Sequence, residues 1–150
     1  MKDKMNFVKV IFYYPISLIY SFVVFIRNRL FDYNFLKSNE FTIPIISVGN
    51  ITVGGTGKTP HIEYLISILK NECKIAVLSR GYKRKSKGFV LAKSDSTYYD
   101  IGDEPKQIKT KFPKIDVAVN ANRTQGIYKL LKLGNPELNT GLLDDAYQHR

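Results

Sequence analysis

The chain has 150 residues, which is enough for one domain with a real hydrophobic core. Its formal net charge of +10 favours anionic partners: nucleotides, phosphorylated substrates, nucleic acid or an acidic membrane surface. The single cysteine, Cys73, excludes an internal disulfide and suits a reducing compartment, where it is most simply a small, partly buried apolar residue.

The first segment, residues 1–38, is rich in aromatic side chains. An uncharged run extends from Val10 to Ile26 between basic residues, and Arg27 and Arg29 close it. A helix over this run would be about 25 Å long, slightly short of a hydrocarbon core of about 30 Å. Pro15 allows a helix start or a kink at that point.

Four interpretations of this segment compete. A cleaved signal peptide is disfavoured, because Arg27-Asn28-Arg29 stands where a small-residue cleavage site belongs. A spanning helix would be short, and basic residues at both ends give no orientation. An aromatic core helix of a soluble protein is the simplest alternative. We favour a membrane-docking helix over 1–38, with its basic flanks on anionic headgroups, and leave open whether it spans the bilayer or lies in it.

The most informative stretch is residues 43–60. A β-branched apolar run at 43–48 meets a glycine cluster that ends in Gly57-Lys58-Thr59, and a helix with apolar periodicity is expected over 58–70. The order of strand, glycine loop and helix N-terminus is typical of a phosphate-binding loop. Lys58 would reach the β- and γ-phosphates of a nucleoside triphosphate, and Thr59 would ligate Mg²⁺.

Thr52 occupies the position where the usual phosphate-loop pattern has its first glycine. The alternative is therefore a glycine-rich strand-to-helix turn with an unrelated Lys-Thr pair, but the flanking elements favour nucleotide binding. The predicted nucleotide-binding residues are Thr52, Val53, Gly54, Gly55, Thr56, Gly57, Lys58 and Thr59.

Further apolar runs predict a mostly parallel sheet. We expect strands at 74–79, 89–92, 115–120 and, more weakly because of Gly141, at 138–145. Tyr98 and Tyr99 are expected across a turn. Asn122 can cap a helix that ends near Gly134 and Pro136. The predicted fold class is α/β: a P-loop NTPase-like, mostly parallel sheet with flanking helices, preceded by the N-terminal membrane-associated helix.

Five basic residues fall within 80–87 without an acidic residue among them. This run is either a solvated loop or an anion site at the carboxyl edge of the sheet, where ligands of α/β folds collect. Nucleic acid is disfavoured, because no recognition module or interleaved aromatic platform is present. Arg123 falls in the first turn of its helix, which is unfavourable for a cation, and a surface position is the simplest account.

Two pairs of acidic residues are candidates for chemistry. Asp103 and Glu104 precede Pro105, so one of them is expected to cap a helix, and the alternative is a carboxylate that activates a substrate hydroxyl. Asp144 and Asp145 end an apolar run, where a phosphate loop needs an acidic strand end to help hold Mg²⁺.

Four blocks, residues 47–60, 78–82, 102–105 and 143–150, resemble in order the tetraacyldisaccharide 4′-kinase family of lipid A biosynthesis. The resemblance implies ATP-dependent phosphorylation of the 4′-hydroxyl of a lipid A disaccharide 1-phosphate, with Mg²⁺, at the cytoplasmic face of the inner membrane. Residues 1–38 would dock the protein on anionic lipids of that membrane as a peripheral or monotopic protein, and residues 39–150 would be the first part of a P-loop kinase domain. No nucleic acid and no obligate protein partner is indicated.

The resemblance also implies roles for individual residues. Asp103 would be the general base on the acceptor hydroxyl, supported by Glu104, while Lys58 would serve the nucleotide. Thr59, Asp144 and Asp145 would act at or near the metal. The Thr52 departure is shared by the family pattern.

The sequence stops at Arg150, the last residue of the fourth block, without a turn, cap or polar tail, which is typical of the middle of a protein. In the family a distant histidine assists the base, and neither His61 nor His149 is a convincing substitute. We therefore expect the 150-residue chain alone to be inactive or nearly inactive. The alternative function is a membrane-anchored regulatory P-loop NTPase without a lipid acceptor, which would hydrolyse nucleotide unaided.

Overall fold

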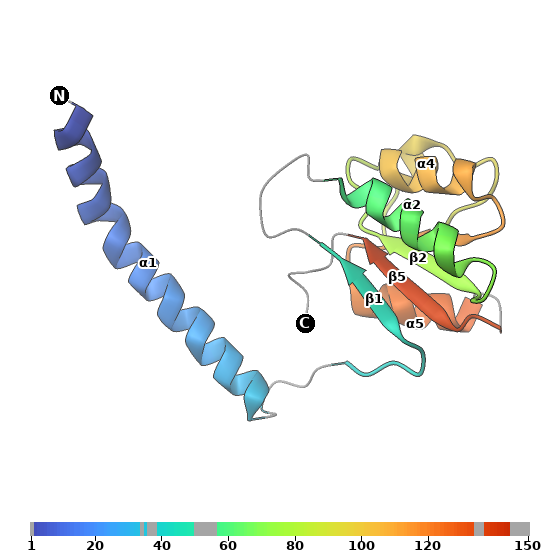
Figure 1. The fold of residues 1–150 in the computed structure, drawn as a ribbon, viewed down its shortest axis with the longest axis horizontal. Coiled ribbons are helices and arrows are strands. Elements are labelled where there is room, and N and C mark those ends of the chain that lie inside the picture. The colour runs from blue at the N-terminus through green and yellow to red at the C-terminus, as the bar shows by residue number, and fades with distance from the viewer. Residues whose placement is uncertain (1, 34, 36–38, 50–56, 134–136, 145–150) are drawn as a thin grey trace. The chain divides into compact units, whose positions relative to one another are not determined.

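In the computed structural model the chain divides into two compact units, residues 1–39 and 40–150. The structure describes all residues except 1, 34, 36–38, 50–56, 134–136 and 145–150 (Figure 1). The first unit is a single long helix, α1, Lys2–Asp32. Pro15 lies inside α1, so the helix begins well before the proline rather than at it. None of the described helices has both the length and the apolar character needed to cross a bilayer.

The second unit is a five-stranded sheet with helices on both faces (Figure 1). Its strands are β1 Ile45–Val48, β2 Ile75–Ser79, β3 Val90–Leu91, β4 Asp116–Val119 and β5 Thr140–Asp144. Its helices are α2 Lys58–Leu69, α3 Tyr98–Ile101, α4 Asp103–Lys111 and α5 Arg123–Leu133. The strand order is β1-β5-β2-β4-β3, parallel except for the antiparallel pair of β3 with β4. The predicted α/β class with a mostly parallel sheet is confirmed.

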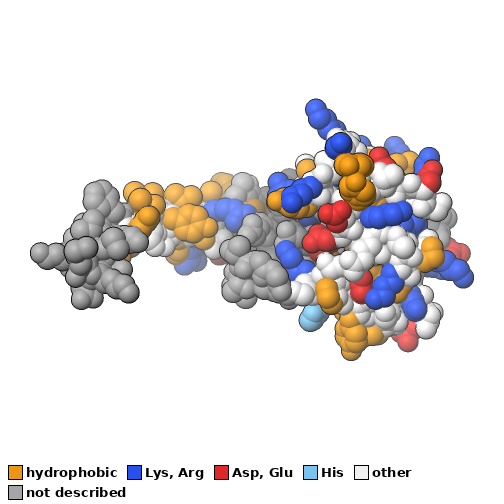
Figure 2. All heavy atoms as spheres, turned by 90° about the horizontal axis from the view of Figure 1, so that it is seen from above, with side chains coloured by type: hydrophobic (Ala, Val, Ile, Leu, Met, Phe, Trp, Pro, Cys, Tyr) orange, Lys and Arg blue, Asp and Glu red, His pale blue; other side chains and the backbone are white. Residues whose placement is uncertain are grey.

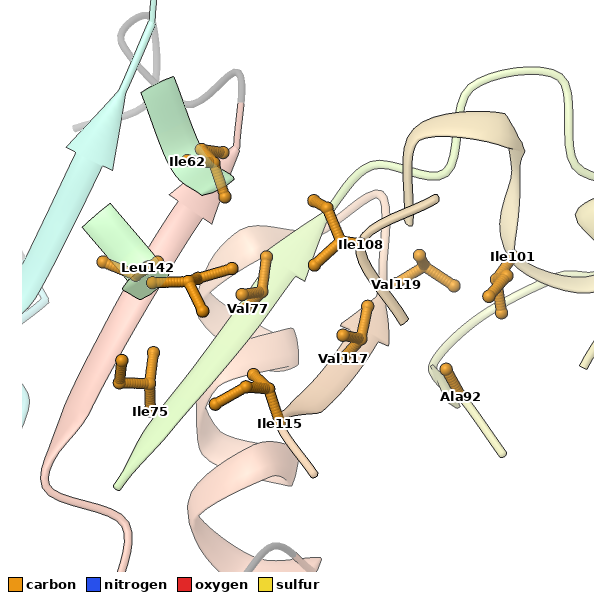
Figure 3. Close-up of a cluster of buried hydrophobic side chains, with 11 residues drawn as sticks. Ile62, Ile75, Val77, Ala92, Ile101, Ile108, Ile115, Val117, Val119 and Leu142 are labelled. Carbon is orange, nitrogen blue, oxygen red and sulfur yellow. The ribbon is translucent and has the colours of Figure 1, made fainter. Parts of the chain in front are cut away.

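The central strands alternate their side chains between two apolar cores. Val77 of β2 and Leu142 of β5 pack with Ile62 of α2 and Ile108 of α4 on one face (Figure 3). On the other face Leu78 is one of the β-strand residues that pack against α5; the buried members of this cluster are Ala76, Leu78, Ala118, Ile127, Leu130 and Leu143. Because successive strand residues point to opposite faces, uniformly apolar strands are what a sheet covered on both sides requires.

The strand expected to be weak, β5, is instead fully buried between β1 and β2. A Cβ atom on its Gly141 would lie 2.6 Å from Cδ1 of Ile45. Glycine at position 141 therefore leaves room for the Ile45 side chain of the neighbouring strand β1. This close packing offsets the low intrinsic strand preference of glycine.

Residues 98–101, which lie across a turn from β3 as expected, form the short helix α3. The carboxylate of Asp100 accepts hydrogen bonds from the backbone N–H and the hydroxyl of Thr97, both at 2.7 Å. These bonds, above all the backbone one, hold the pKa of Asp100 below its usual value. The capping box formed by Thr97 and Asp100 thus starts this helix.

Replacing a fully buried core side chain is expected to destabilise the second unit. Leu142→Ala removes a side chain with 0% exposure and should lower the free energy of unfolding by about 2–4 kcal/mol. Urea denaturation measures this loss. Ile68→Ala, at a half-exposed position of α2, is the control, and equal losses in the two variants would contradict the described core.

Candidate functional site

Four parallel strands bring their carboxyl ends to one edge of the sheet, the edge at which ligands bind in α/β folds. Asp144 ends β5 and is level with Val48, the last residue of β1. Ser79 ends β2, and Asn120 follows β4 directly. Polar side chains from distant parts of the sequence thus converge here.

The described part of the phosphate loop has the geometry of an anion-binding helix start. Gly57 precedes α2 in a left-handed conformation, φ 76° and ψ 26°, and its carbonyl accepts a hydrogen bond from the backbone N–H of His61 at 3.1 Å. Lys58 and Thr59 form the half-buried first turn, which contains no acidic residue. The positive end of the helix is therefore left for an anion. His61 itself is exposed.

Residues 52–56 of the predicted loop, Thr52, Val53, Gly54, Gly55 and Thr56, lie outside the described residues, and their contacts with nucleotide stay predictions. The same holds for Asp145 and His149.

Asp144 is held in a buried position at the sheet edge. Its side chain is 2% exposed, and its Oδ2 accepts a hydrogen bond from the Ser79 hydroxyl at 3.1 Å. The Ser79 Oγ in turn accepts the backbone N–H of Gly81 at 3.5 Å, which ties the loop after β2 to the carboxylate. Ser79 was not predicted as a site residue, since its partner lies 65 positions away.

The donor set fits the predicted Mg²⁺. The Thr59 hydroxyl and the Asp144 carboxylate are hard oxygen ligands of the kind that Mg²⁺ prefers. Within the described part of the chain, no three His, Cys, Asp or Glu side chains gather as a metal-binding group. Mg²⁺ takes one or two protein carboxylates and completes its shell with phosphate oxygens and water. Its binding here stays a prediction.

The expected surface position of Arg123 is wrong. Arg123 is 5% exposed, and its Nη1 and Nη2 donate hydrogen bonds of 2.8 Å each to the backbone carbonyls of Asn120 and Asp144. The guanidinium thereby joins the ends of β4 and β5, and the two hydrogen bonds offset its unfavourable place in a first helical turn. The predicted cap of the same helix is confirmed, because Asn122 Oδ1 accepts the N–H of Gln125 at 2.9 Å.

The expectation that Asp103 or Glu104 caps a helix is also wrong. Helix α4 already begins at Asp103, and its N-cap is Gly102. Gly102 has φ 91° and ψ 165°, a conformation that L side chains rarely adopt, which explains why a glycine ends the preceding turn. Asp103 and Glu104 are instead exposed first-turn residues, where carboxylates interact favourably with the helix N-terminus.

The start of α4 packs closely against the loop after β2. A Cβ on Gly102 would lie 2.9 Å from the Tyr82 carbonyl oxygen, and one on Gly81 would lie 2.9 Å from the Ile101 carbonyl oxygen. This close backbone contact fixes where Asp103 begins. Its side chain is exposed and makes no hydrogen bond or ion pair with another described residue, and its role as general base stays a prediction.

The basic run lines an open cavity of about 510 Å³ beside this contact, with Arg80, Lys83, Arg84 and Lys87 among its walls. Arg84 is fixed within it, because its Nη1 donates to Ser86 Oγ at 3.1 Å and its Nη2 to the Gly88 carbonyl at 2.5 Å. Burial lowers the pKa of Arg84. The run is thus an ordered loop, and its role as an anion site stays a prediction.

The two helices that carry Lys58 and Asp103 are joined by one carboxylate. Glu63 of α2 accepts hydrogen bonds from Lys111 at 2.6 Å and from Gln107 at 2.8 Å, both on α4. The Lys111 bond, aided by Gln107 and the positive charge of Lys111, lowers the pKa of Glu63 against the opposing effect of burial. The stabilisation from this shift is present above the usual carboxyl pKa and is lost as pH falls through the lowered value.

Glu63→Gln should therefore lower the free energy of unfolding at pH 7, and the difference from the parent protein should disappear in acid. Urea midpoints of the variant and the parent protein should differ at pH 7 and converge as the pH falls below about 4. Glu72→Gln, at an exposed carboxylate without an ion pair among the described residues, should change neither value. A difference that grows in acid would contradict the bridge.

A parallel sheet whose first strand leads to a helix beginning with Lys58-Thr59, beside a buried carboxylate on the adjacent strand, defines a P-loop nucleotide-binding protein. Residues 10–150 match the family model described as LpxK, tetraacyldisaccharide-1-P 4′-kinase. The chain belongs to this family.

Named relatives agree with the family. A tetraacyldisaccharide 4′-kinase of Bacteroides thetaiotaomicron is 56% identical over 137 residues, which is 91% of this chain and 36% of the relative. That of Flavobacterium psychrophilum is 57% identical over 147 residues, 97% of this chain and 42% of the relative. A crystal structure of LpxK from Aquifex aeolicus in complex with ATP is 37% identical, with a TM-score of 0.75 over 91% of this chain and 44% of that one. The chain therefore spans about two-fifths of the length of these relatives.

Proposed function

We propose that this protein transfers the γ-phosphoryl group of ATP to the 4′-hydroxyl of a lipid A disaccharide 1-phosphate. The family match over residues 10–150 carries the proposal, because the members of this family are named for one phosphoryl-transfer reaction. Phosphoryl transfer depends mainly on positioning and charge neutralisation, so few protein groups are required.

The nucleotide end of the proposed site lies at the start of α2. Lys58 and the helix N-terminus would bind the β- and γ-phosphates. Thr59, Asp144 and Asp145 would hold Mg²⁺, and the ion when bound neutralises charge that develops on the phosphates. The Ser79 hydrogen bond and the Arg123 hydrogen bonds keep the end of β5 in place for this task.

The acceptor end lies at the start of α4. The exposed Asp103 carboxylate would take the proton of the 4′-hydroxyl as the hydroxyl oxygen attacks the γ-phosphorus. The bond from that phosphorus to the β–γ bridging oxygen breaks, and ADP leaves. Glu104, next in the same turn, would support the base. The close contact between the backbones at Gly81 and Gly102, which fixes where α4 begins, supports this assignment.

We also propose that α1 docks the protein on the cytoplasmic face of the inner membrane, as a peripheral or monotopic protein. From Tyr13 onward most apolar side chains of α1 are exposed, and Figure 2 shows them with basic side chains between them. Arg27 and Arg29 near the end of the helix lie over the rings of Phe31 and Phe25, at 5.3 and 5.2 Å from the ring centroids. Such a surface suits an interface with anionic lipids.

The direct test uses the protein at the full length of its relatives with γ-labelled ATP. Label should appear in the lipid fraction only when a tetraacylated disaccharide 1-phosphate is present. Release of labelled inorganic phosphate at the same rate with and without the lipid would refute the kinase and support the regulatory NTPase instead.

A further inference from the structure

The loop after β2 and the helix α3 together form an exposed surface rich in lysine and tyrosine. We call it the Tyr–Lys surface, and its members are Tyr82, Lys83, Lys85, Lys87, Tyr98 and Tyr99. Two hydrogen bonds join its segments: the backbone N–H of Lys85 donates to the Tyr99 carbonyl at 2.7 Å, and the Ser86 hydroxyl donates to the Asp100 carbonyl. The surface is therefore a single built piece.

Its tyrosines are unusually open to solvent. Tyr82 is 71% exposed, Tyr98 50% and Tyr99 46%. The ring centroids of Tyr98 and Tyr99 are 4.1 Å apart, and the Lys85 ammonium lies 4.2 Å from the ring centroid of Tyr99. An apolar ring that carries a polar hydroxyl, set beside a cation, suits the boundary between water and a bilayer.

The surface and the loop that carries it hold more basic than acidic side chains, and Asp100 and Asp103 are their acidic neighbours. None of its three lysines forms an ion pair with a described carboxylate, and the nearest acid in sequence, Asp100, is engaged by Thr97. Arg80 and Arg84 add to the same positive region. Figure 2 shows basic, acidic and hydrophobic side chains next to one another on the second unit.

We propose that the Tyr–Lys surface docks the second unit on an anionic lipid bilayer, independently of α1. The lysines meet headgroup phosphates, and the tyrosine rings enter the interfacial layer. Single-stranded nucleic acid is the less suited occupant, because it needs free ring faces for stacking, and here one ring face is covered by Lys85 and another by the neighbouring tyrosine. Since this surface follows the end of β2, docking brings the carboxyl edge of the sheet to the lipid.

The chain has no tryptophan, so a single substitution gives a fluorophore that reports on one position only. In the full chain, the fluorescence of Tyr82→Trp should shift to the blue and be quenched by vesicles of brominated phosphatidylglycerol. Vesicles of brominated phosphatidylcholine, which carry no net charge, should do neither. Tyr64→Trp, at a 63% exposed position of α2, is the matched control and should change with neither. The vesicles hold no kinase acceptor, so the result is independent of the proposed reaction.

Charge variants complete the test. Lys83→Gln, Lys85→Gln and Lys87→Gln together, in the Tyr82→Trp background, should weaken the quenching by bromolipid about tenfold or more. Lys93→Gln, Lys114→Gln and Lys132→Gln, which remove the same charge from exposed positions elsewhere, should leave it unchanged. Binding through α1 without any change at Tyr82→Trp, equal changes at both tryptophans, or a shift caused by oligonucleotide but not by vesicles would each overturn the proposal.

Discussion

Asp103→Asn should lower kcat by about 10²–10⁴ while changing the Kd of ATP by no more than about twofold, because the substitution removes a proton acceptor from the acceptor end of the site only. Initial-rate assays of label transfer to the lipid measure kcat, and equilibrium ATP binding measures the Kd of ATP, both on full-length protein. The amide keeps the size of the side chain at an exposed position, so the loss cannot come from packing.

Asp95→Asn is the matched control, since Asp95 is also exposed and makes no hydrogen bond or ion pair with a described residue. It should leave kcat unchanged. Full turnover of the Asp103→Asn protein, or a loss of ATP binding equal to the loss of kcat, would remove Asp103 from the role of base.

Arg123→Met should lower the free energy of unfolding by about 3–6 kcal/mol, because it deletes two hydrogen bonds from a buried cation and leaves both carbonyls with one partner fewer. It should also weaken ATP·Mg²⁺ binding, since the Asp144 carbonyl is one of the two acceptors. Arg123→Lys should restore little, because one ammonium cannot reproduce the fork that spans two strand ends.

Urea denaturation and nucleotide titration measure these effects. Lys132→Met, at an exposed position of the same helix, provides the control and should cost little. A stability loss of similar size in the two methionine variants would show that the hydrogen bonds of Arg123 do not join the strands.

Apolar runs were sufficient to predict the elements that form the sheet. The runs that contain β2 and β5 are short and continuous, which is what strands covered on both faces require, and a strand followed by a glycine loop and a helix predicts parallel pairing. Asn122 was predictable as a cap for a similar reason, because its partner Gln125 is only three residues away.

The sequence failed where a residue's partner is distant or is backbone. Arg123 reaches a carbonyl 21 positions away, so helix-dipole reasoning within its own first turn placed it on the surface. Ser79 looked like the ordinary end of an apolar run until the fold set it against Asp144. Gly102 acts as N-cap because the Tyr82 backbone passes too close for a side chain, a contact that no local pattern encodes.

Together these contacts describe the site that we propose, with two ends on one sheet edge. The nucleotide end would be formed by α2 and β5, and the acceptor end by the loop after β2 and α4. Glu63 joins α2 to α4 through its hydrogen bonds with Gln107 and Lys111. In the proposed reaction, ATP and the lipid acceptor would approach from different elements.

The position of the transferred phosphate tests this account most directly. Full-length protein, ATP, Mg²⁺ and the tetraacylated disaccharide 1-phosphate should yield a product whose new phosphorus couples, in a phosphorus–proton NMR correlation, to the proton on the 4′ carbon of the distal sugar. A new phosphate at any other carbon, or ATP consumed with only inorganic phosphate formed, would contradict it.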